Sequence, residues 1–190
     1  MKYKIPAVIF AGGKSTRMGK DKALLPFAGY SSLAQYQYER LGQFFETVYL
    51  SAKADKFDFD ASLISDRYEI SSPLAGIVTV FETLDVEEVF ILSVDAPFVN
   101  ETVIKTLIEK RGKEDNAVIA RTPNGLQPLC GIYRRSILPF AQRALQEDRH
   151  KLTQLLKEAK SKSVLFKEEA LFANLNHPYE YKEALKSFKL

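Results

Sequence analysis

Short apolar runs alternate along the chain with segments whose apolar residues recur at helical spacing. The first run, Ile5–Phe10, is almost continuously apolar, which is typical of a strand that is covered on both faces of a sheet. Further strands are expected at 48–50, 62–64, 89–94, 117–119 and 129–133. Strands that alternate with helices predict a single α/β domain of the three-layer, Rossmann-like kind, with a mostly parallel central sheet.

The clearest helix follows Ser72, a good N-cap residue, and Pro73, which suits the first helical position. Its apolar stripe comprises Leu74, Ile77, Val78, Phe81 and Leu84. Other helices are expected from about residue 31, after Asn100, at about 135–146 and 151–159, and after Pro178. The second half is less regular: a strand pair is expected at 164–166 and 171–173, and the pattern leaves the strand order open.

Composition narrows the class of protein. A chain of 190 residues fits one domain. A net charge of +3 argues against a dedicated nucleic-acid-binding protein. The single cysteine, Cys130, cannot form an intrachain disulfide, and it lies in an apolar run that predicts a core position. This favours a reducing, cytoplasmic compartment. No apolar run approaches the ~18 residues of a membrane span, so no membrane partner is expected.

The strongest chemical feature is the segment Ala11–Lys22, which directly follows the first strand. Its glycines, Gly12 and Gly13, allow backbone N–H groups to approach an anion. Positive charge comes from Lys14, Arg17, Lys20 and Lys22. The segment is not a Walker A loop, because Val8 stands where that motif needs its first glycine. It predicts a binding site for a triphosphate, and a solvated basic turn is the alternative.

Three further segments are candidates for the same site. Asp95 follows the strand at 89–94, and ligands of open α/β sheets bind beyond the carboxyl ends of strands. A carboxylate there could hold Mg²⁺ over phosphates, although turns also favour aspartate. Asp66 follows the strand at 62–64 and could accept hydrogen bonds from a base or sugar, or lie on the surface. Ala75 and Gly76 are small enough for a planar base to approach the helix start.

The chain resembles the molybdenum cofactor guanylyltransferase family of nucleotidyltransferases over nearly its whole length. The segments that carry the resemblance are Ala11–Lys22, Ser72–Ile77, Val94–Phe98, Gln127–Ser136 and Asn174–Pro178. The resemblance implies that GMP passes from GTP to the terminal phosphate of molybdopterin, with or without its molybdenum, and that pyrophosphate leaves. It also implies Mg²⁺ as cofactor, a nucleotide-binding part at about 1–100 and an acceptor-binding part at about 101–190. Other cofactor-biosynthesis proteins, molybdoenzymes or their chaperones are implied partners.

The resemblance also assigns roles to residues. Lys22, Arg17 and Asp95 are the implied catalytic residues, and Asp95 is the implied metal ligand. Asn174 and Asn176 are implied for the acceptor. The implied nucleotide-binding residues are Phe10, Ala11, Gly12, Gly13, Lys14, Lys22, Ser51, Asp66, Pro73, Leu74, Gly76 and Asp95.

Some positions depart from the family pattern. Phe10 stands where relatives often have leucine, Ser51 where they have asparagine, and Gln127 where they often have histidine. Gly12 favours guanylyl over cytidylyl transfer, because the cytidylyltransferase relatives tend to have alanine there. The alternatives are cytidylyl transfer to molybdopterin, a nucleotidyltransferase for a sugar phosphate or another phosphorylated acceptor, and a non-catalytic GTP-binding cofactor carrier.

Overall fold

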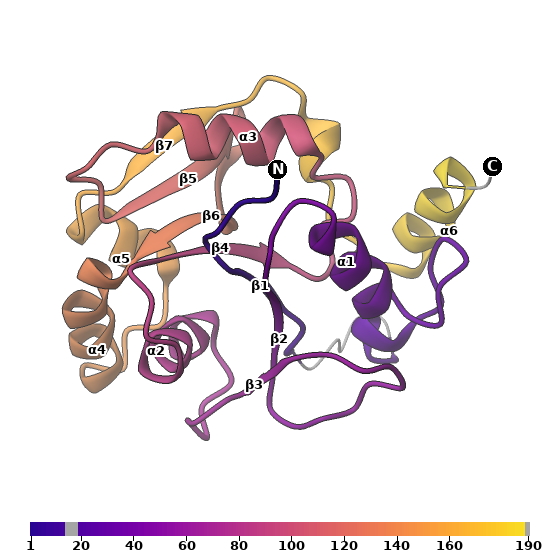
Figure 1. Ribbon diagram of the computed structural model, residues 1–190, viewed down its shortest axis with the longest axis horizontal. Coiled ribbons are helices and arrows are strands. Elements are labelled where there is room, and N and C mark those ends of the chain that lie inside the picture. The colour runs from indigo at the N-terminus through magenta and orange to yellow at the C-terminus, as the bar shows by residue number, and fades with distance from the viewer. Residues whose placement is uncertain (14–18, 189–190) are drawn as a thin grey trace.

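A seven-stranded sheet forms the centre of the molecule in the computed structural model, which describes residues 1–13 and 19–188 (Figure 1). Its strands are β1 (Ala7–Phe10), β2 (Val48–Ala52), β3 (Leu63–Ser65), β4 (Glu88–Ser93), β5 (Ala117–Thr122), β6 (Gly125–Arg134) and β7 (Lys162–Leu165). They lie in the order β3-β2-β1-β4-β6-β5-β7. Only β6 runs antiparallel to its neighbours, β4 and β5. The sheet is therefore mostly parallel, as predicted.

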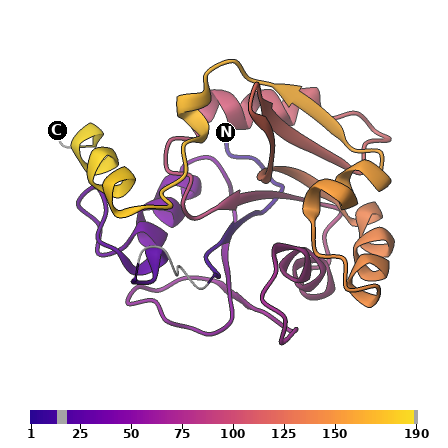
Figure 2. The same cartoon turned by 180° about the vertical axis from the view of Figure 1, so that it is seen from behind.

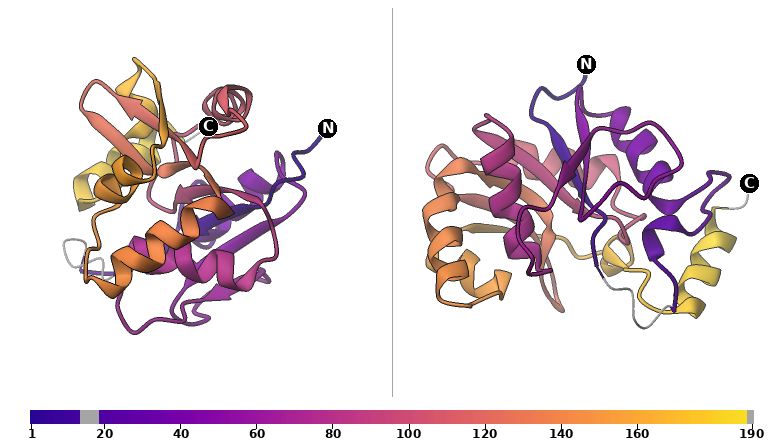
Figure 3. Two further views of the ribbon diagram at one scale, coloured as in Figure 1. Left: turned by 90° about the vertical axis from the view of Figure 1, so that its left-hand side faces the viewer. Right: turned by 90° about the horizontal axis from the view of Figure 1, so that it is seen from below.

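Helices cover both faces of this sheet (Figures 2 and 3). They are α1 (Leu33–Gly42), α2 (Pro73–Thr83), α3 (Glu101–Lys110), α4 (Leu138–Gln146), α5 (Leu152–Glu158) and α6 (Pro178–Ser187). Three short 3-10 helices, η1 (Lys22–Leu24), η2 (Arg135–Ile137) and η3 (Glu169–Phe172), complete the described elements. This arrangement confirms the three-layer α/β class.

Alternation along the strands divides the interior into two cores. Ala7 and Ile9 of β1 join the core that contains α1, α3 and α6. Val8 and Phe10 join the core that contains α2, α4 and α5. Successive side chains of a strand point to opposite faces, so an almost continuous apolar run supplies both cores. All four β1 residues are buried.

One expected strand is wrong. Residues 164–166 overlap β7, but Leu171 and Phe172 belong to the 3-10 helix η3. Instead of forming a hairpin with that segment, β7 pairs in parallel with β5. Phe172 is buried, because η3 turns its ring into the core beneath the sheet edge. Hydrophobicity alone does not distinguish these two ways of burying a short apolar run.

No helix in the described part of the chain is long and apolar enough to span a bilayer.

Candidate active site

The candidate site lies where the central parallel strands end. Phe10, the last residue of β1, is in register with Ser51 of β2 and with Ser93 of β4. Asp66 follows β3. Its backbone N–H donates to the carbonyl of Ala52 at 3.0 Å, a typical hydrogen-bond distance. The loops that follow these strands therefore meet at one edge of the sheet, as ligand sites of open α/β folds do.

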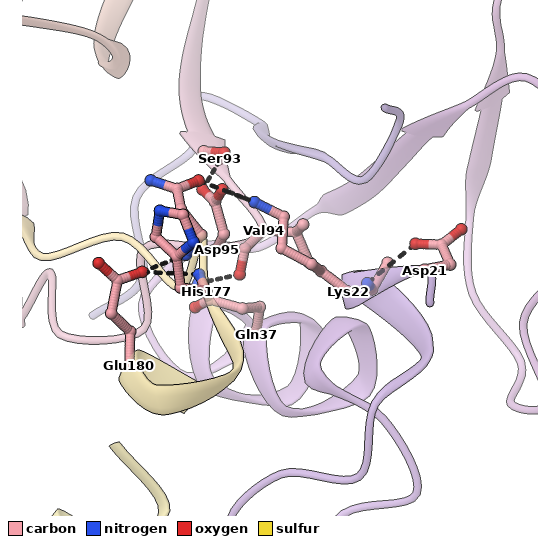
Figure 4. Close-up of polar contacts among 10 residues, drawn as sticks. Asp21, Lys22, Gln37, Ser93, Val94, Asp95, His177 and Glu180 are labelled. Carbon is pink, nitrogen blue, oxygen red and sulfur yellow. Dashed lines mark hydrogen bonds and ion pairs between the residues drawn. The ribbon is translucent and has the colours of Figure 1, made fainter. Parts of the chain in front are cut away.

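Lys22, Asp95 and Asn176 come together at this edge, although they lie far apart in the sequence. The Lys22 ammonium forms an ion pair with Asp95 Oδ2 (Figure 4). It also donates to Asn176 Oδ1 at 3.1 Å. The side chains of Lys22 and Asp95 are only 16% and 13% exposed. A half-buried cation and a carboxylate at a strand end suit the binding of phosphate groups.

Asp95 is held from several directions. Ser93 Oγ donates to Asp95 Oδ1 at 2.6 Å, and the N–H of Leu175 donates to the Asp95 carbonyl at 2.9 Å. Gln37 Nε2, which is fully buried in α1, donates to the carbonyl of Val94 at 3.1 Å. These bonds fix the backbone on both sides of the carboxylate, so its orientation is set before any ligand binds.

The segment that carries Asn176 is fixed by the start of α6. The Glu180 carboxylate accepts hydrogen bonds from the N–H groups of Asn176 at 2.7 Å and His177 at 2.8 Å (Figure 4). These backbone bonds stabilise the charged form, and the pKa of Glu180 lies below its usual value although burial acts in the opposite direction. The acidic residue in the first turn thus positions the amide that meets Lys22.

A small cavity of about 120 Å³ adjoins the ends of β1 and β2. Its lining includes seven of the residues predicted to bind the nucleotide: Phe10, Gly12, Gly13, Ser51, Asp66, Pro73 and Gly76. Burial raises the pKa of the Asp66 carboxyl, while the hydrogen bond from Ser51 (3.3 Å) and the charges of two lysines act in the opposite direction. Ser51, which departs from the asparagine of the family pattern, thus contacts the Asp66 carboxylate.

A large cavity of about 420 Å³ lies on the other side of Pro73, Ser93 and Leu129, which border both cavities. Asp95 and Asn174 line the large cavity, together with Gln127, Lys151 and His150. The reacting groups of two substrates could therefore meet near Ser93 and Asp95. Cys130 also borders this space, but burial raises its thiol pKa to about 12, so it is not a thiolate nucleophile.

A chain of hydrogen bonds links the two cavities. Ser72 Oγ caps α2 by accepting from Ala75 N–H at 3.2 Å, and it contacts His150 Nδ1 at 3.2 Å. The other ring nitrogen of His150 contacts Asp148 Oδ1 at 2.7 Å. This serine–histidine–aspartate order resembles a hydrolytic triad, but the serine oxygen is engaged as a helix cap and the aspartate side chain is 87% exposed. We interpret it as a support for the start of α2.

Several predicted residues occupy positions that restrict their roles. Both backbone groups of Ala11 have partners: its N–H donates to Ser51 and its carbonyl accepts from Lys56. The side chain of Leu74 is fully buried in the core, so only its backbone is available to a ligand. Lys14 and Arg17 lie outside the described residues, and their roles stay predictions.

Three supporting residues were not identified from the sequence: Gln37, Lys56 and His150. Gln37 carried a usable signal, because it stands between Leu33 and Leu41 on the buried side of α1, where a polar side chain needs a partner. Lys56 and His150 lie in polar loops without a motif, and their partners are distant in sequence.

Oxygen donors around Asp95 match the preferences of Mg²⁺. The Asp95 carboxylate, the Ser93 hydroxyl and the Asn176 amide oxygen are hard ligands. Within the described ranges, no three His, Cys, Asp or Glu side chains form a metal-binding group. The donor set therefore fits an ion held by one carboxylate together with substrate phosphates, provided that Lys22 releases its contact with Asp95.

Comparison with known proteins agrees with this geometry. The chain is 37% identical to a molybdenum cofactor guanylyltransferase of Campylobacter jejuni over 182 residues, which cover 95% of each chain. The structure of molybdopterin-guanine dinucleotide biosynthesis protein A from Archaeoglobus fulgidus superposes with a TM-score of 0.80 at 21% identity, covering 96% of this chain and 98% of that one.

The fold alone extends to other nucleotidyltransferases. The 2-C-methyl-D-erythritol 4-phosphate cytidylyltransferase of Thermus thermophilus superposes with a TM-score of 0.76 at 14% identity, over 99% of this chain and 100% of that one. The family model described as the MobA-like NTP transferase domain matches residues 7–164, which include β1, the predicted phosphate loop and Asp95. These matches confirm the predicted resemblance to the molybdenum cofactor guanylyltransferases, and the chain belongs to the MobA-like NTP transferase family.

Proposed function

We propose that this protein transfers GMP from GTP to the terminal phosphate of molybdopterin and releases pyrophosphate. The observation that carries the proposal is the cluster of Lys22, Asp95 and Asn176 next to Ser93, which borders both cavities, in a chain similar over nearly its full length to a guanylyltransferase. Two cavities of unequal size, with shared walls, suit a reaction that joins two substrates.

In this reaction an oxygen of the molybdopterin phosphate attacks the α-phosphorus of GTP. A new P–O bond forms, and the bond from the α-phosphorus to the bridging oxygen breaks, so that pyrophosphate leaves with the electron pair. No protein nucleophile is required, and positioning and charge stabilisation supply the catalysis. The Lys22 ammonium can exchange Asp95 for phosphate oxygens, since both are anionic partners for a lysine. Arg17 is proposed to add positive charge to the same phosphates.

Asp95 is the proposed ligand of Mg²⁺, with Ser93 and Asn176 close to the same position. When bound, the ion would supply positive charge that neutralises the phosphates. The chain's own contribution is to hold the Asp95 carboxylate in the large cavity, against Ser93, which borders both cavities. Asn174, which lines the large cavity, and Asn176 are proposed to orient the acceptor. This assigns the nucleotide mainly to residues before about 100 and the acceptor mainly to residues after it.

Space beside Gly12 supports guanine as the base. A Cβ added at Gly12 would approach Asp66 Oδ2 no closer than 3.9 Å, which is ordinary van der Waals contact. The surrounding protein therefore tolerates alanine at this position, and the glycine leaves room in the small cavity for a ligand. A purine base needs more of that room than a pyrimidine does.

We further propose a compartment and partners for the protein. The single, buried cysteine cannot form an intrachain disulfide, which suits the cytoplasm. We propose contacts with other cofactor-biosynthesis proteins and with molybdoenzymes or their chaperones, which would pass the cofactor on.

The first experiment measures pyrophosphate release from GTP, CTP, ATP and UTP with Mg²⁺, each with and without molybdopterin. We expect release from GTP that depends on molybdopterin and on the metal. Release from CTP instead would indicate the cytidylyl reaction. Binding of GTP without release from any nucleotide would contradict the proposal and favour a carrier.

The Asp95→Ala variant should lower kcat by about 100-fold or more, the usual order for the loss of one key electrostatic group. Asp95→Asn, which keeps the size of the side chain, should be similarly impaired. Asp85→Ala is a matched control, because that exposed aspartate follows α2 and lies away from the cavities. Unchanged turnover in both Asp95 variants would exclude the metal assignment.

A further inference from the structure

Lys56 lies in the loop between β2 and β3, yet it contacts both ends of the segment that leaves β1. Its ammonium donates to the carbonyl of Ala11 at 2.9 Å and to Asp21 Oδ2 at 2.5 Å. Ala11 directly follows β1, and Asp21 directly precedes η1. One side chain from a distant loop therefore joins Ala11 and Asp21, which lie at the two ends of the Gly-rich segment.

Asp21 transmits this contact to Lys22. The Oδ1 atom of Asp21 accepts the N–H of Ala23 at 3.0 Å and so caps η1, whose first residue is Lys22. The other carboxylate oxygen, Oδ2, is the one that meets Lys56. The cap and the ion pair share one carboxylate, so movement of Lys56 changes the orientation of η1 and the direction in which Lys22 points.

We propose that Lys56 is a positioning residue that sets Lys22 and the end of β1 for the triphosphate. The proposal rests on the assignment of GTP to this site, and it adds a residue outside the motifs that carry the family resemblance. A surface ion pair alone would stabilise the fold only slightly. The Lys56 side chain is 25% exposed and also bonds a backbone carbonyl, so its two contacts act on geometry more than on stability.

The chain offers a matched control in Lys53, which lies three residues earlier in the same loop. Lys53 donates to the carbonyl of Glu69 at 2.9 Å. Both lysines act electrostatically on Asp66 in the small cavity. Only Lys56 reaches Ala11 and Asp21. Lys53→Met therefore removes the same charge from the same loop and leaves the proposed contacts intact.

The test compares steady-state pyrophosphate release by Lys56→Met, Lys56→Arg, Asp21→Asn and Lys53→Met with that of the unaltered protein. We expect Lys56→Met to raise the KM for GTP about tenfold, because a shift of about 1 Å in a binding group has effects of this order or larger. The KM for molybdopterin and the Tm should stay close to those of Lys53→Met. Lys56→Arg keeps the positive charge and offers several N–H donors, so it should recover most of the affinity.

Asp21→Asn combined with Lys56→Met should be no worse than Lys56→Met alone, since Lys56→Met already removes the ion pair with Asp21. Equal KM values for GTP in Lys56→Met and Lys53→Met would overturn the inference while leaving the proposed function in place. Absence of GTP binding and of turnover in the unaltered protein would overturn both. Binding of a fluorescent GTP analogue provides the same comparison without the acceptor.

Discussion

Phe10 and Gly76 form a contact that shapes the small cavity. A Cβ added at Gly76 would lie 2.8 Å from Cε2 of the Phe10 ring, closer than atoms can approach without a shift. Phe10 is 8% exposed and borders the small cavity. The small residue in α2 thus provides the space for the larger residue in β1. A phenylalanine at position 10 is compatible with the fold because position 76 is glycine.

Gly76→Ala should push the Phe10 ring toward the cavity and raise the KM for GTP. Overpacking of this kind costs about 1–3 kcal/mol of stability. Adding Phe10→Leu should relieve the contact and recover most of both losses, which steady-state kinetics and chemical denaturation would measure. Gly42→Ala is the control, since a Cβ at that helix end meets no atom within 4 Å. An unchanged KM in Gly76→Ala would show that the ring does not reach the nucleotide.

Individual residues differ in how far their position was predictable. Asp66 and Asp95 follow strands, so parallel-sheet geometry alone brings them to one edge. Asn176 was placed there only by family resemblance, because nothing in its local pattern indicates that it contacts Lys22. Lys56 and His150 act through partners 45 and 78 positions away in sequence, which no local pattern encodes.

At the scale of elements, α2 connects the two cavities. Its N-cap, Ser72, borders the small cavity, and the same hydroxyl contacts His150 of the large cavity. Eight consecutive residues of this helix, Leu74–Phe81, are all buried, so its position is fixed by packing along its length. Its start is the part that depends on polar contacts.

Ser72→Ala should lower the free energy of unfolding by about 1 kcal/mol, the usual cost of losing an N-cap, and should also raise the KM for GTP. Asn100→Ala removes the equivalent cap of α3, where Asn100 Oδ1 accepts from Val103 N–H at 3.1 Å. That control should lose similar stability and keep its KM, because Asn100 lines neither cavity. Equal kinetic effects in the two variants would contradict a local role for Ser72.

The short apolar runs expected as strands were confirmed with one exception, the run at 171–173. The stripe of α2 and the run of β1 each satisfy one pattern over several residues. Residues 171–173 do not, and η3 rather than a strand buries Phe172. The reversed direction of β6 depends on pairing with both β4 and β5, which is a property of the sheet and not of the segment.

For the molecule as a whole, the sheet separates two cores, and Cys130 lies in the core that contains α1, α3 and α6. Cys130 is 3% exposed, and burial raises its thiol pKa to about 12. A thiol reacts through its thiolate, so almost none is reactive near neutral pH in the folded protein.

Modification of Cys130 by a thiol reagent at pH 8 should therefore proceed only as fast as the protein unfolds. In concentrated guanidinium the single thiol should react at once and completely, which is the control. Following the reaction at increasing denaturant concentrations would give the opening free energy of this core. If modification is instead fast in buffer and is slowed by GTP or molybdopterin, the reagent enters through the large cavity.

The junction of Asp95 with Leu175 and Asn176 has a consequence for protein synthesis. Ribosomes extend the chain from its N-terminus, so all seven strands exist before residues 174–176 are added. Until then the carbonyl of Asp95 lacks the N–H of Leu175, and Lys22 lacks the amide of Asn176. A nascent chain can thus build the nucleotide side of the site while the contacts that complete it are still missing. The hydrogen bonds that complete the site therefore form only after translation has passed this segment.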